Sequence, residues 1–210
     1  MRSSQDMDRF VALHLSMAQC TDCPLHESRT QVVPGDGPWD AEVMLIGEAP
    51  GASEDALGKP FVGASGKLLD PLLSSNCIGR ENIYVTNVVK CRPPGNRQPT
   101  HEEMVTCYKY LDAQIKFINP RVIILCGATA LKLFNRRGKI TEDHGVPFTC
   151  EGKVCLPTYH AAAALRTRSL VFDIANDLKK VKEILKNGTP DGIRDFSVVK
   201  AYQRKLYRER

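Results

Sequence analysis

Four short apolar runs alternate with segments of helical pattern along the chain, and this alternation limits the possible folds more than any other feature. The runs cover residues 42–46, 83–86, 122–125 and 153–156, and each has the length of a buried strand. Strands that alternate with helices indicate a parallel sheet covered by helices on both faces. We therefore expect an α/β fold, with three α/β/α layers around a central four-stranded parallel sheet.

Helical signals fill the spaces between these runs. We expect helices over residues 5–19, 68–73, 101–118, 128–134 and 173–185. Thr100 and Glu103 have the spacing of a capping box, in which each side chain accepts a hydrogen bond from the other residue's backbone at the start of a helix. Gly188 follows the last of these segments and is suited to end it.

The length and composition suit one domain. The 210 residues are 42% hydrophobic and 25% charged, as in soluble globular proteins, and no apolar run is long enough to cross a bilayer. The first residues lack the apolar core and the cleavage site of a signal peptide, so we expect a cytoplasmic protein without a membrane partner. We assign residues 1–190 to the domain and residues 191–210 to a basic tail.

The net charge of +5 is concentrated in that tail. Six basic and two acidic residues lie between Arg194 and Arg210, so the tail carries +4 and the body is close to neutral. Net charge is therefore weak evidence for a nucleic-acid partner. We interpret the tail as a solvated terminus, with contact to a DNA backbone as the alternative.

Chemically useful side chains follow the expected strands. Ligands of parallel α/β sheets bind beyond the carboxyl ends of the strands, which meet at one edge. The residues at those ends are Gly47-Glu48, Asn87, Gly127 and Thr158-Tyr159-His160. The topology thus brings a carboxylate, a carboxamide and an imidazole to one edge, and we predict a ligand site there.

Four sequence motifs resemble those of one enzyme family. The segment from Gly47 to Asp55 reads Gly-Glu-Ala-Pro-Gly-Ala-Ser-Glu-Asp and resembles the first motif of the family 4 uracil-DNA glycosylases. Residues 58–63 (Gly-Lys-Pro-Phe-Val-Gly), 84–94 (Tyr-Val-Thr-Asn-Val-Val-Lys-Cys-Arg-Pro-Pro) and 160–166 resemble its further motifs in the same order. The resemblance extends from about residue 20 to about residue 186. Each motif alone is modest evidence, whereas the ordered set is highly specific.

The resemblance implies a base excision repair enzyme. Such an enzyme flips uracil out of DNA and hydrolyses its N-glycosidic bond, which releases free uracil and leaves an abasic site. Phe61 resembles the residue on which the flipped base stacks, a contact worth roughly 1–3 kcal/mol. Asn87 resembles the base reader, because its carboxamide can accept from uracil N3–H and donate to O4. Cytosine presents the opposite pattern and would be rejected.

Further pocket residues follow from the same resemblance. His160 resembles the donor to uracil O2, where negative charge builds in the transition state. Glu48 is placed to favour the cationic sugar or to orient the attacking water, and both roles stay open. Glu54 resembles a residue that helps to exclude the methyl group of thymine. Gly47 and Ala49 belong to the same substrate-binding loop.

Three arginines are candidates for DNA contact, and one position departs from the family. Arg92, Arg97 and Arg166 are expected to bind phosphates, which positions the duplex without reading it. The family usually has proline after the histidine, where this chain has Ala161. Proline would stiffen the loop, so we expect a less restrained His160 here.

Eight cysteines in a chain without an export signal argue against a disulfide framework. The resemblance selects Cys20, Cys23, Cys91 and Cys107 as ligands of a [4Fe–4S] cluster with a structural role. Their spacing alone would suit zinc equally well. The other cysteines are interpreted as core or incidental thiols: Cys77, Cys126, Cys150 and Cys155.

Other interpretations remain. A related group with the same cluster fold forms a covalent bond to DNA through a histidine in an inserted basic loop. Residues 89–99 carry no histidine, so we expect turnover, and no lysine lies in a motif for Schiff-base chemistry. The alternatives are a redox protein, which would leave the carboxylate, amide and imidazole without a purpose, and a non-catalytic nucleic-acid binder.

We expect the protein to be a monomer that acts on uracil-containing single- or double-stranded DNA. Gln203-x-x-Leu206 is a fragment of a motif for binding a sliding clamp.

Overall fold

The computed structural model of the chain describes residues 3–196. These residues contain one six-stranded sheet with the strand order β2-β1-β3-β5-β4-β6. The strands are β1 (Val43–Gly47), β2 (Ile83–Asn87), β3 (Val122–Cys126), β4 (Phe148–Cys150), β5 (Lys153–Thr158) and β6 (Arg194–Asp195). The first four strands in this order are parallel, whereas β4 is antiparallel to β5.

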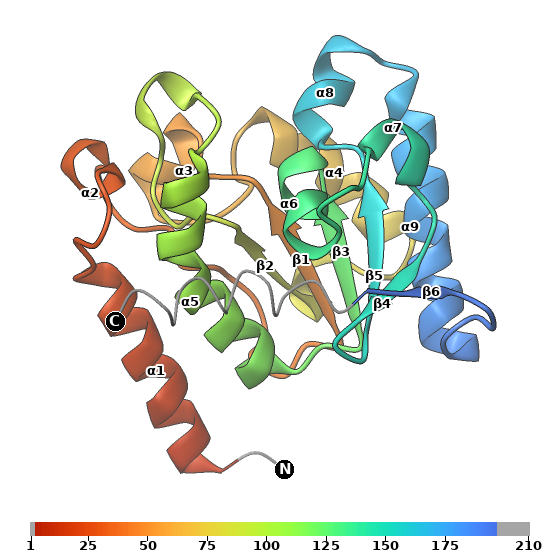
Figure 1. The fold of residues 1–210 in the computed structure, drawn as a ribbon, viewed down its shortest axis with the longest axis horizontal. Helices are drawn as coiled ribbons and strands as arrows, with labels where there is room; N and C mark the ends of the chain where they lie inside the picture. Colours follow the sequence, from red (N-terminus) through yellow and green to blue (C-terminus); the bar gives the residue numbers. More distant parts are fainter. Residues whose placement is uncertain (1–2, 197–210) are drawn as a thin grey trace.

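Helices cover both faces of the sheet (Figure 1). They are α1 (Ser4–Ala18), α2 (Leu25–Ser28), α3 (Ala52–Leu57), α4 (Ala64–Ser75), α5 (His101–Ile118), α6 (Ala128–Phe134), α7 (Ile140–Asp143), α8 (Ala161–Arg166) and α9 (Leu170–Asn187). Two 3₁₀ turns, η1 (Arg80–Asn82) and η2 (Pro94–Asn96), lie in the connections. Figure 1 shows α6 in front of the strands and α4 behind them.

Two apolar cores lie on opposite faces of the sheet. In β1, Met44 and Ile46 join the core that α1, α5 and α6 cover. Val43 and Leu45 alternate with them and join the core that α4, α8 and α9 cover. Because both faces are covered, every residue of β1, β2 and β3 is buried, and the strands are apolar runs rather than alternating ones.

The predicted α/β class with three layers is confirmed, but the sheet is larger than predicted. The four expected strands form its parallel block, and the prediction of a four-stranded sheet was wrong because it omitted β4 and β6. These strands have three and two residues, which is too short for a hydrophobic pattern. The turn from β4 to β5 uses positive φ at Glu151 and Gly152, as two-residue hairpins require.

The five expected helices are present, with ends shifted by a few residues. The capping box is confirmed: the Thr100 hydroxyl accepts from the Glu103 backbone, and the Glu103 carboxylate accepts from the Thr100 backbone. The short helices α2, α3, α7 and α8 were not predicted. Among the described residues, no helix combines the length and the apolar character needed to span a membrane.

The end of the chain continues the sheet beyond the predicted domain boundary. β6 follows residue 190 and pairs with β4, and the backbone N–H of Phe196 donates to the Thr149 carbonyl at 2.7 Å. Residues 197–210, with most of the basic tail and the sliding-clamp fragment, lie outside the described residues. The division at residue 190 stays a prediction.

Candidate functional site

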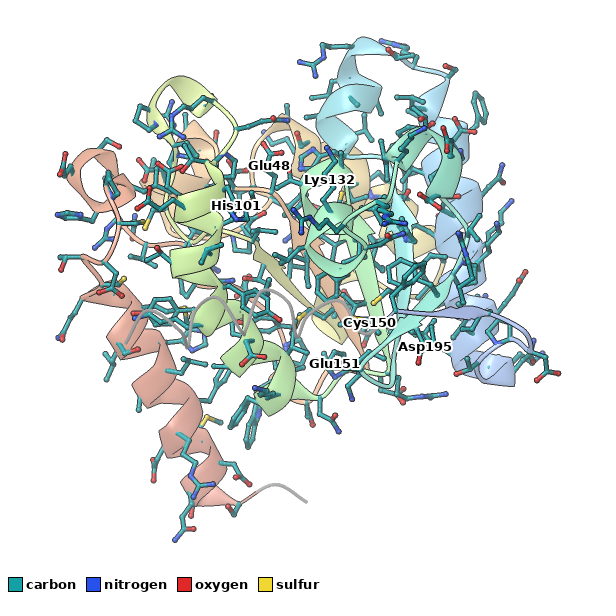
Figure 2. All side chains as sticks on the ribbon, viewed as in Figure 1. Glu48, His101, Lys132, Cys150, Glu151 and Asp195 are labelled. Carbon is teal, nitrogen blue, oxygen red and sulfur yellow. The ribbon has the colours of Figure 1, made fainter. Side chains whose placement is uncertain are left out.

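The carboxyl edge of the parallel block holds a cavity of about 250 Å³. Its walls include Glu48, Ala49, Glu54, Phe61, Asn87 and His160. Figure 2 shows Glu48 near the upper end of the strands, far from Glu151 at the opposite end. Residues that are more than 100 positions apart in the chain therefore converge on one space, as the rule for parallel sheets predicts.

Phe61 is held against the end of β1 by two glycines. A Cβ atom on Gly47 would lie 2.6 Å from Phe61 Cζ and would also overlap the side-chain oxygen of Asn87. A Cβ atom on Gly66 would overlap the Phe61 carbonyl. Only glycine at position 47 allows the Phe61 ring and the Asn87 amide to pack this closely against the end of β1.

The backbone of Phe61 is fixed in an unusual conformation. Its φ of 53° lies in the left-handed region, which costs free energy for a residue other than glycine. The Arg80 guanidinium donates to the Pro60 carbonyl at 3.0 Å and to the Phe61 carbonyl, and it pairs with Asp70 at 2.7 Å. These contacts hold the ring in place without a ligand.

Glu54 holds the other side of the same turn. One carboxylate oxygen accepts from the backbone N–H groups of Val62 at 3.0 Å and Gly63 at 2.8 Å, and the other accepts from Gly51 at 3.1 Å. Glu54 lines the cavity, but its oxygens are bonded to the backbone around Phe61. Exclusion of thymine by Glu54 stays a prediction, and its visible role is to shape the wall.

The Asn87 side chain ends β2 and is only 2% exposed. Among residues 3–196, its carboxamide has no hydrogen-bond partner, whereas its backbone carbonyl accepts from Lys90 Nζ at 2.7 Å. Among the described residues, no fully buried side-chain N or O atom lacks a hydrogen-bond partner, so the amide atoms of Asn87 are open to the cavity. The amide is therefore anchored through its backbone and available to a ligand through its side chain.

His160 is the N-cap residue of α8, and its hydrogen bond defines its tautomer. Nδ1 accepts from the backbone N–H of Ala162 at 3.1 Å, so the proton of the neutral ring lies on Nε2. Burial lowers the pKa of His160, against a smaller opposing effect of the Glu54 carboxylate. The ring lies 5.7 Å from that of Phe61 with an interplanar angle of 28°. His160 is thus a neutral donor beside the aromatic wall.

Ala161 replaces the family's usual proline without changing the expected backbone. His160 has φ −69° and ψ 133°, which is the extended conformation that a following proline imposes. Ala161 is the fully buried first residue of α8, a position where proline is common. Gly127, with φ 97°, lies against the Cβ atom of His160 and leaves room for it.

Glu48 is oriented by a residue that the sequence analysis missed. The Thr129 hydroxyl, in the first turn of α6, donates to Glu48 Oε2. Oε1 has no hydrogen-bond partner among the described residues. Thr129 lies two residues after Gly127, which follows β3 at the same edge of the sheet, and that position was the available signal.

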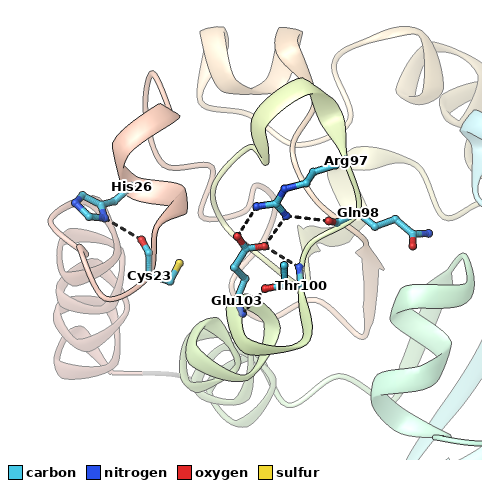
Figure 3. Close-up of polar contacts among 6 residues, drawn as sticks. All are labelled: Cys23, His26, Arg97, Gln98, Thr100 and Glu103. Atoms are coloured by element: carbon cyan, nitrogen blue, oxygen red, sulfur yellow. Dashed lines mark hydrogen bonds and ion pairs between the residues drawn. The ribbon is translucent and has the colours of Figure 1, made fainter.

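The three candidate DNA-binding arginines differ in their surroundings. Arg97 lines the cavity, but its guanidinium forms a two-bonded pair with Glu103 at 2.6 and 2.8 Å (Figure 3). Arg97 correspondingly lowers the pKa of Glu103. Arg92 donates to the Asn96 side chain at 2.7 Å. Arg166 is exposed at the end of α8 and has no ion-pair partner among the described residues.

A second, small cavity contains all four predicted cluster ligands. Cys20 and Cys23 come from the segment between α1 and α2, Cys91 follows β2, and Cys107 lies in α5. The Arg29 guanidinium donates to Cys91 Sγ at 3.2 Å.

Burial favours the neutral form of three thiols in this second cavity. Burial raises the pKa of Cys107 to about 12 and also raises the pKa of Cys23 and of Cys91. These groups would therefore carry protons unless a metal replaced them.

All four candidate ligands are sulfur donors, which suit zinc and iron–sulfur centres alike. Among residues 3–196, no three His, Cys, Asp or Glu side chains are placed to hold one metal ion. The remaining cysteines are elsewhere: Cys126, Cys150 and Cys155 are buried, and Cys77 is exposed.

Comparison with known proteins identifies the relatives of this chain. The sequence profile described as the Uracil DNA glycosylase superfamily matches residues 34–186. The chain is 47% identical over 173 residues to the type-4 uracil-DNA glycosylase of Thermotoga maritima, covering 80% of this chain and 90% of that protein. It is 40% identical over 188 residues to that of Sulfurisphaera tokodaii, covering 85% and 86%. It is 44% identical over 176 residues to that of Pyrobaculum aerophilum, covering 79% and 89%.

Proposed function

The chain belongs to the uracil DNA glycosylase superfamily, and we propose that the cavity at the carboxyl edge of its sheet is where it removes uracil from DNA. The protein is a DNA repair hydrolase of N-glycosidic bonds, which releases uracil and leaves an abasic site. The observation that carries the site assignment is the unpaired carboxamide of Asn87, which faces a cavity shared with Phe61 and His160.

Asn87 reads the base in this proposal. Its carboxamide oxygen accepts from uracil N3–H, and its carboxamide nitrogen donates to uracil O4. Neither amide atom has another hydrogen-bond partner among the described residues. Phe61 stacks on the flipped base, at roughly 1–3 kcal/mol. Because Gly47 and the Arg80 contacts fix the ring in advance, little ordering remains to be done when the base enters.

His160 stabilises the departing uracil anion. As the glycosidic bond breaks, negative charge grows on uracil O2, and the Nε2–H of a neutral imidazole can donate to it. The hydrogen bond from Ala162 to Nδ1 supports this direction of donation, because it leaves the proton on the other nitrogen.

Glu48 acts on the sugar side of the bond. Its carboxylate, oriented by Thr129, either stabilises the positive charge that develops on the sugar or orients the water that attacks it. The first role depends mainly on the charge of the carboxylate, and the second depends also on its orientation by Thr129.

Arg166 and its neighbour bind the DNA next to the cavity. Arg166 is free to contact a phosphate, and Leu165 beside it is 47% exposed. Apolar side chains at such positions can enter the base stack and fill the space of a flipped base. Arg97, which is paired with Glu103, contributes by shaping the wall, and Arg92 remains a candidate phosphate contact.

Cys20, Cys23, Cys91 and Cys107 hold a [4Fe–4S] cluster in this proposal. The support is the family, the shared cavity and the all-sulfur donor set. When bound, the cluster supplies a rigid crosslink between the N-terminal segment, the loop after β2 and α5. Purified protein should be brown and absorb broadly near about 400 nm, and it should contain a fixed number of iron atoms per protein chain. Colourless protein with one zinc ion after anaerobic preparation would contradict it.

One assay tests the proposed function. An oligonucleotide with a single uracil is incubated with the protein and then treated with alkali, which cleaves DNA at abasic sites. Cleavage at the uracil position, and none in matched cytosine or thymine oligonucleotides, is expected. Asn87→Ala should abolish this product while the visible absorbance stays unchanged. Equal cleavage by the variant would contradict the assignment of Asn87.

A further inference from the structure

The segment from Leu165 to Phe172 continues outward from a wall of the base cavity. Ala162, near the start of α8, lines the cavity, and the buried residues Ala161 and Ala164 hold this helix against the core. Three backbone hydrogen bonds then turn the chain into α9. Figure 1 shows α8 and the turn after it beyond the upper ends of the strands. The segment therefore lies at the same edge of the sheet as the base cavity.

Phe172 lies on the outer face of α9 and takes no part in the core. The buried residues of this helix, such as Ile174 and Leu178, form a stripe on the opposite face. Phe172 is 74% exposed, the largest fraction among the large hydrophobic residues that the structure describes. Asn176 and Lys179, one and two turns further along the same face, are exposed and hydrogen-bonded to each other. The ring is thus a single aromatic group on a polar face of the helix.

The charge around Phe172 indicates a partner, whereas its exposure alone does not, because single apolar residues are common on protein surfaces. Residues 165–172 include Arg166 and Arg168 but no acidic residue. Both guanidinium groups are exposed and have no hydrogen-bond or ion-pair partner among the described residues. Asp173 follows, but it is partly buried and lies in the first turn of α9, where an acid interacts favourably with the helix itself. Free cations beside an exposed ring suit a nucleic acid, because the cations bind phosphates and the ring stacks on a base.

The distance from the base cavity limits which form of DNA can use the ring. α8 has six residues, so it is about 9 Å long at 1.5 Å per residue. This is less than the length of three stacked nucleotides, at about 3.4 Å each. In a duplex, neighbouring base pairs cover the faces of the bases at that distance, and the flipped uracil opens only the step beside Leu165. A single strand leaves its bases uncovered and available for stacking.

We propose that Arg168 and Phe172 form a binding surface for single-stranded DNA beside the base cavity. An unpaired base within about three nucleotides of the uracil stacks on the Phe172 ring, and Arg168 binds a phosphate of the same strand. The surface favours excision from single strands, because a duplex offers the ring no uncovered base. The inference rests on the proposed function, because it takes the base cavity as the place of the uracil.

The test compares uracil excision from a single-stranded oligonucleotide with excision from the same oligonucleotide in a duplex. Phe172→Leu should lower the ratio of the two kcat/KM values at least about fivefold, because leucine is apolar but cannot stack on a base. Phe172→Trp should keep the wild-type ratio. Leu15→Ala is the matched control, because Leu15 is 60% exposed but lies in α1, which Figure 1 shows well separated from α8. An unchanged ratio in Phe172→Leu, or an equal decrease in Phe172→Trp, would overturn the proposal.

Arg168→Gln tests the phosphate contact. Each phosphate that a protein neutralises on a single strand adds about 0.7 to the slope of log binding constant against log salt concentration. The variant should therefore bind a single-stranded oligonucleotide with a slope smaller by about 0.7 than that of wild-type protein. An unchanged slope would overturn the assignment of Arg168.

A further measurement does not depend on uracil. Trp39 is the one tryptophan of the chain, so the fluorescence of the ring added in Phe172→Trp can be followed against wild-type protein. A uracil-free single strand should quench this fluorescence by stacking, and the matching duplex should quench it much less. No quenching by the single strand, or equal quenching by the duplex, would refute the binding surface even if uracil is the substrate. Quenching by the single strand without uracil excision by wild-type protein would support the surface and refute the proposed function.

Discussion

The base cavity and the four-cysteine cavity lie on either side of residues 87–91, yet they satisfy their polar groups in opposite ways. In the base cavity, the Asn87 carbonyl and the Ala162 N–H are hydrogen-bonded, while the Asn87 carboxamide and His160 Nε2 have no partner among the described residues. In the cysteine cavity, Cys91 Sγ accepts from the Arg29 guanidinium and Cys20 Sγ donates to the Asp22 carboxylate. In the proposed function, the first region keeps its bonding groups free for a transient ligand, and the second encloses its sulfur atoms for a bound cluster.

Because the two cavities differ in this way, substitutions in one should affect stability and substitutions in the other should affect activity. Changes in the cysteine cavity remove a crosslink among three segments and should act mainly on folding. Changes in the base cavity remove contacts made to the substrate or the transition state and should act mainly on rate. The following predictions test this separation, beginning with the largest expected effect.

Cys91→Ala should have the largest effect of the substitutions considered, and that effect should be on iron content and stability. Loss of one buried ligand should release the iron and lower the free energy of unfolding by at least about 4 kcal/mol, because the crosslinked segments lose their shared anchor. Iron analysis and thermal unfolding measure both effects. Cys77→Ala, at an exposed thiol, is the matched control and should change neither. Unchanged iron content and an unchanged midpoint in Cys91→Ala would refute the assignment.

His160→Ala should reduce kcat by about 10²–10³-fold, as loss of one donor to a developing oxyanion does. Iron content should stay close to wild type, and loss of the capping bond to Ala162 should lower the free energy of unfolding by only about 0.5–2 kcal/mol. A rate within threefold of wild type would show that the imidazole does not stabilise the leaving base.

The pH dependence of stability follows from the lowered pKa of His160. Unfolded histidine has its ordinary pKa near 6.5, whereas burial lowers it in the folded state. The unfolded chain therefore binds more protons than the folded one below pH about 6.5, so stability is complete above that value and falls as the pH decreases toward the folded pKa. His160→Gln should have a shallower decrease. His14, whose pKa burial also lowers, contributes a slope of the same sign in both proteins.

Glu48→Gln and Thr129→Val distinguish the two roles proposed for Glu48 in the base cavity. The first keeps an oxygen for the Thr129 hydroxyl but removes the charge, and the second keeps the charge but removes the hydrogen bond. If Glu48 acts through its charge, the first variant should lose about 10²-fold in kcat and the second much less. If it orients water, the two variants should lose similar amounts. Normal rates in both variants would exclude Glu48 from the reaction.

Ala161→Pro should have the smallest effect. Because His160 already has the conformation that precedes proline, the substitution should stabilise the protein by about 0.4–1 kcal/mol through the unfolded chain. The backbone N–H of Ala161 approaches the buried Cys126 thiol, and its loss should offset part of that gain. Thermal unfolding measures the difference. A destabilised variant would mean that the alanine N–H contributes more than the lost chain entropy.

The sequence predicts the parts of the molecule whose position depends on topology. The apolar runs around Leu45 and Ile124 identify the parallel strands, and the edge rule then brings Glu48, Asn87 and His160 together, as the structure has them. No such rule places Phe61. Its ring depends on a left-handed backbone and on contacts from distant residues, which leave no periodic pattern.

Pairings between side chains could not be predicted from the sequence either. Arg97 has the appearance of a free phosphate ligand until the fold brings Glu103 to it, and the bond from Thr129 to Glu48 joins residues 81 positions apart. Such contacts depend on side-chain directions that spacing does not determine. The same holds for the two short strands. β4 pairs with β5 on one side and with β6 on the other, and neither short strand has a hydrophobic pattern of its own.

The short connection between Asn87 and Cys91 fixes the length of the chain at that point. One inserted residue would displace either the amide or the thiol by up to about 3.5 Å, more than a hydrogen bond or a metal–sulfur bond tolerates. Insertions there should inactivate the protein, whereas the turn at Gly152, which has open space around it, should accept them. Labels or fusion partners for following this protein on DNA therefore belong at that turn, at the opposite end of the sheet from the base cavity.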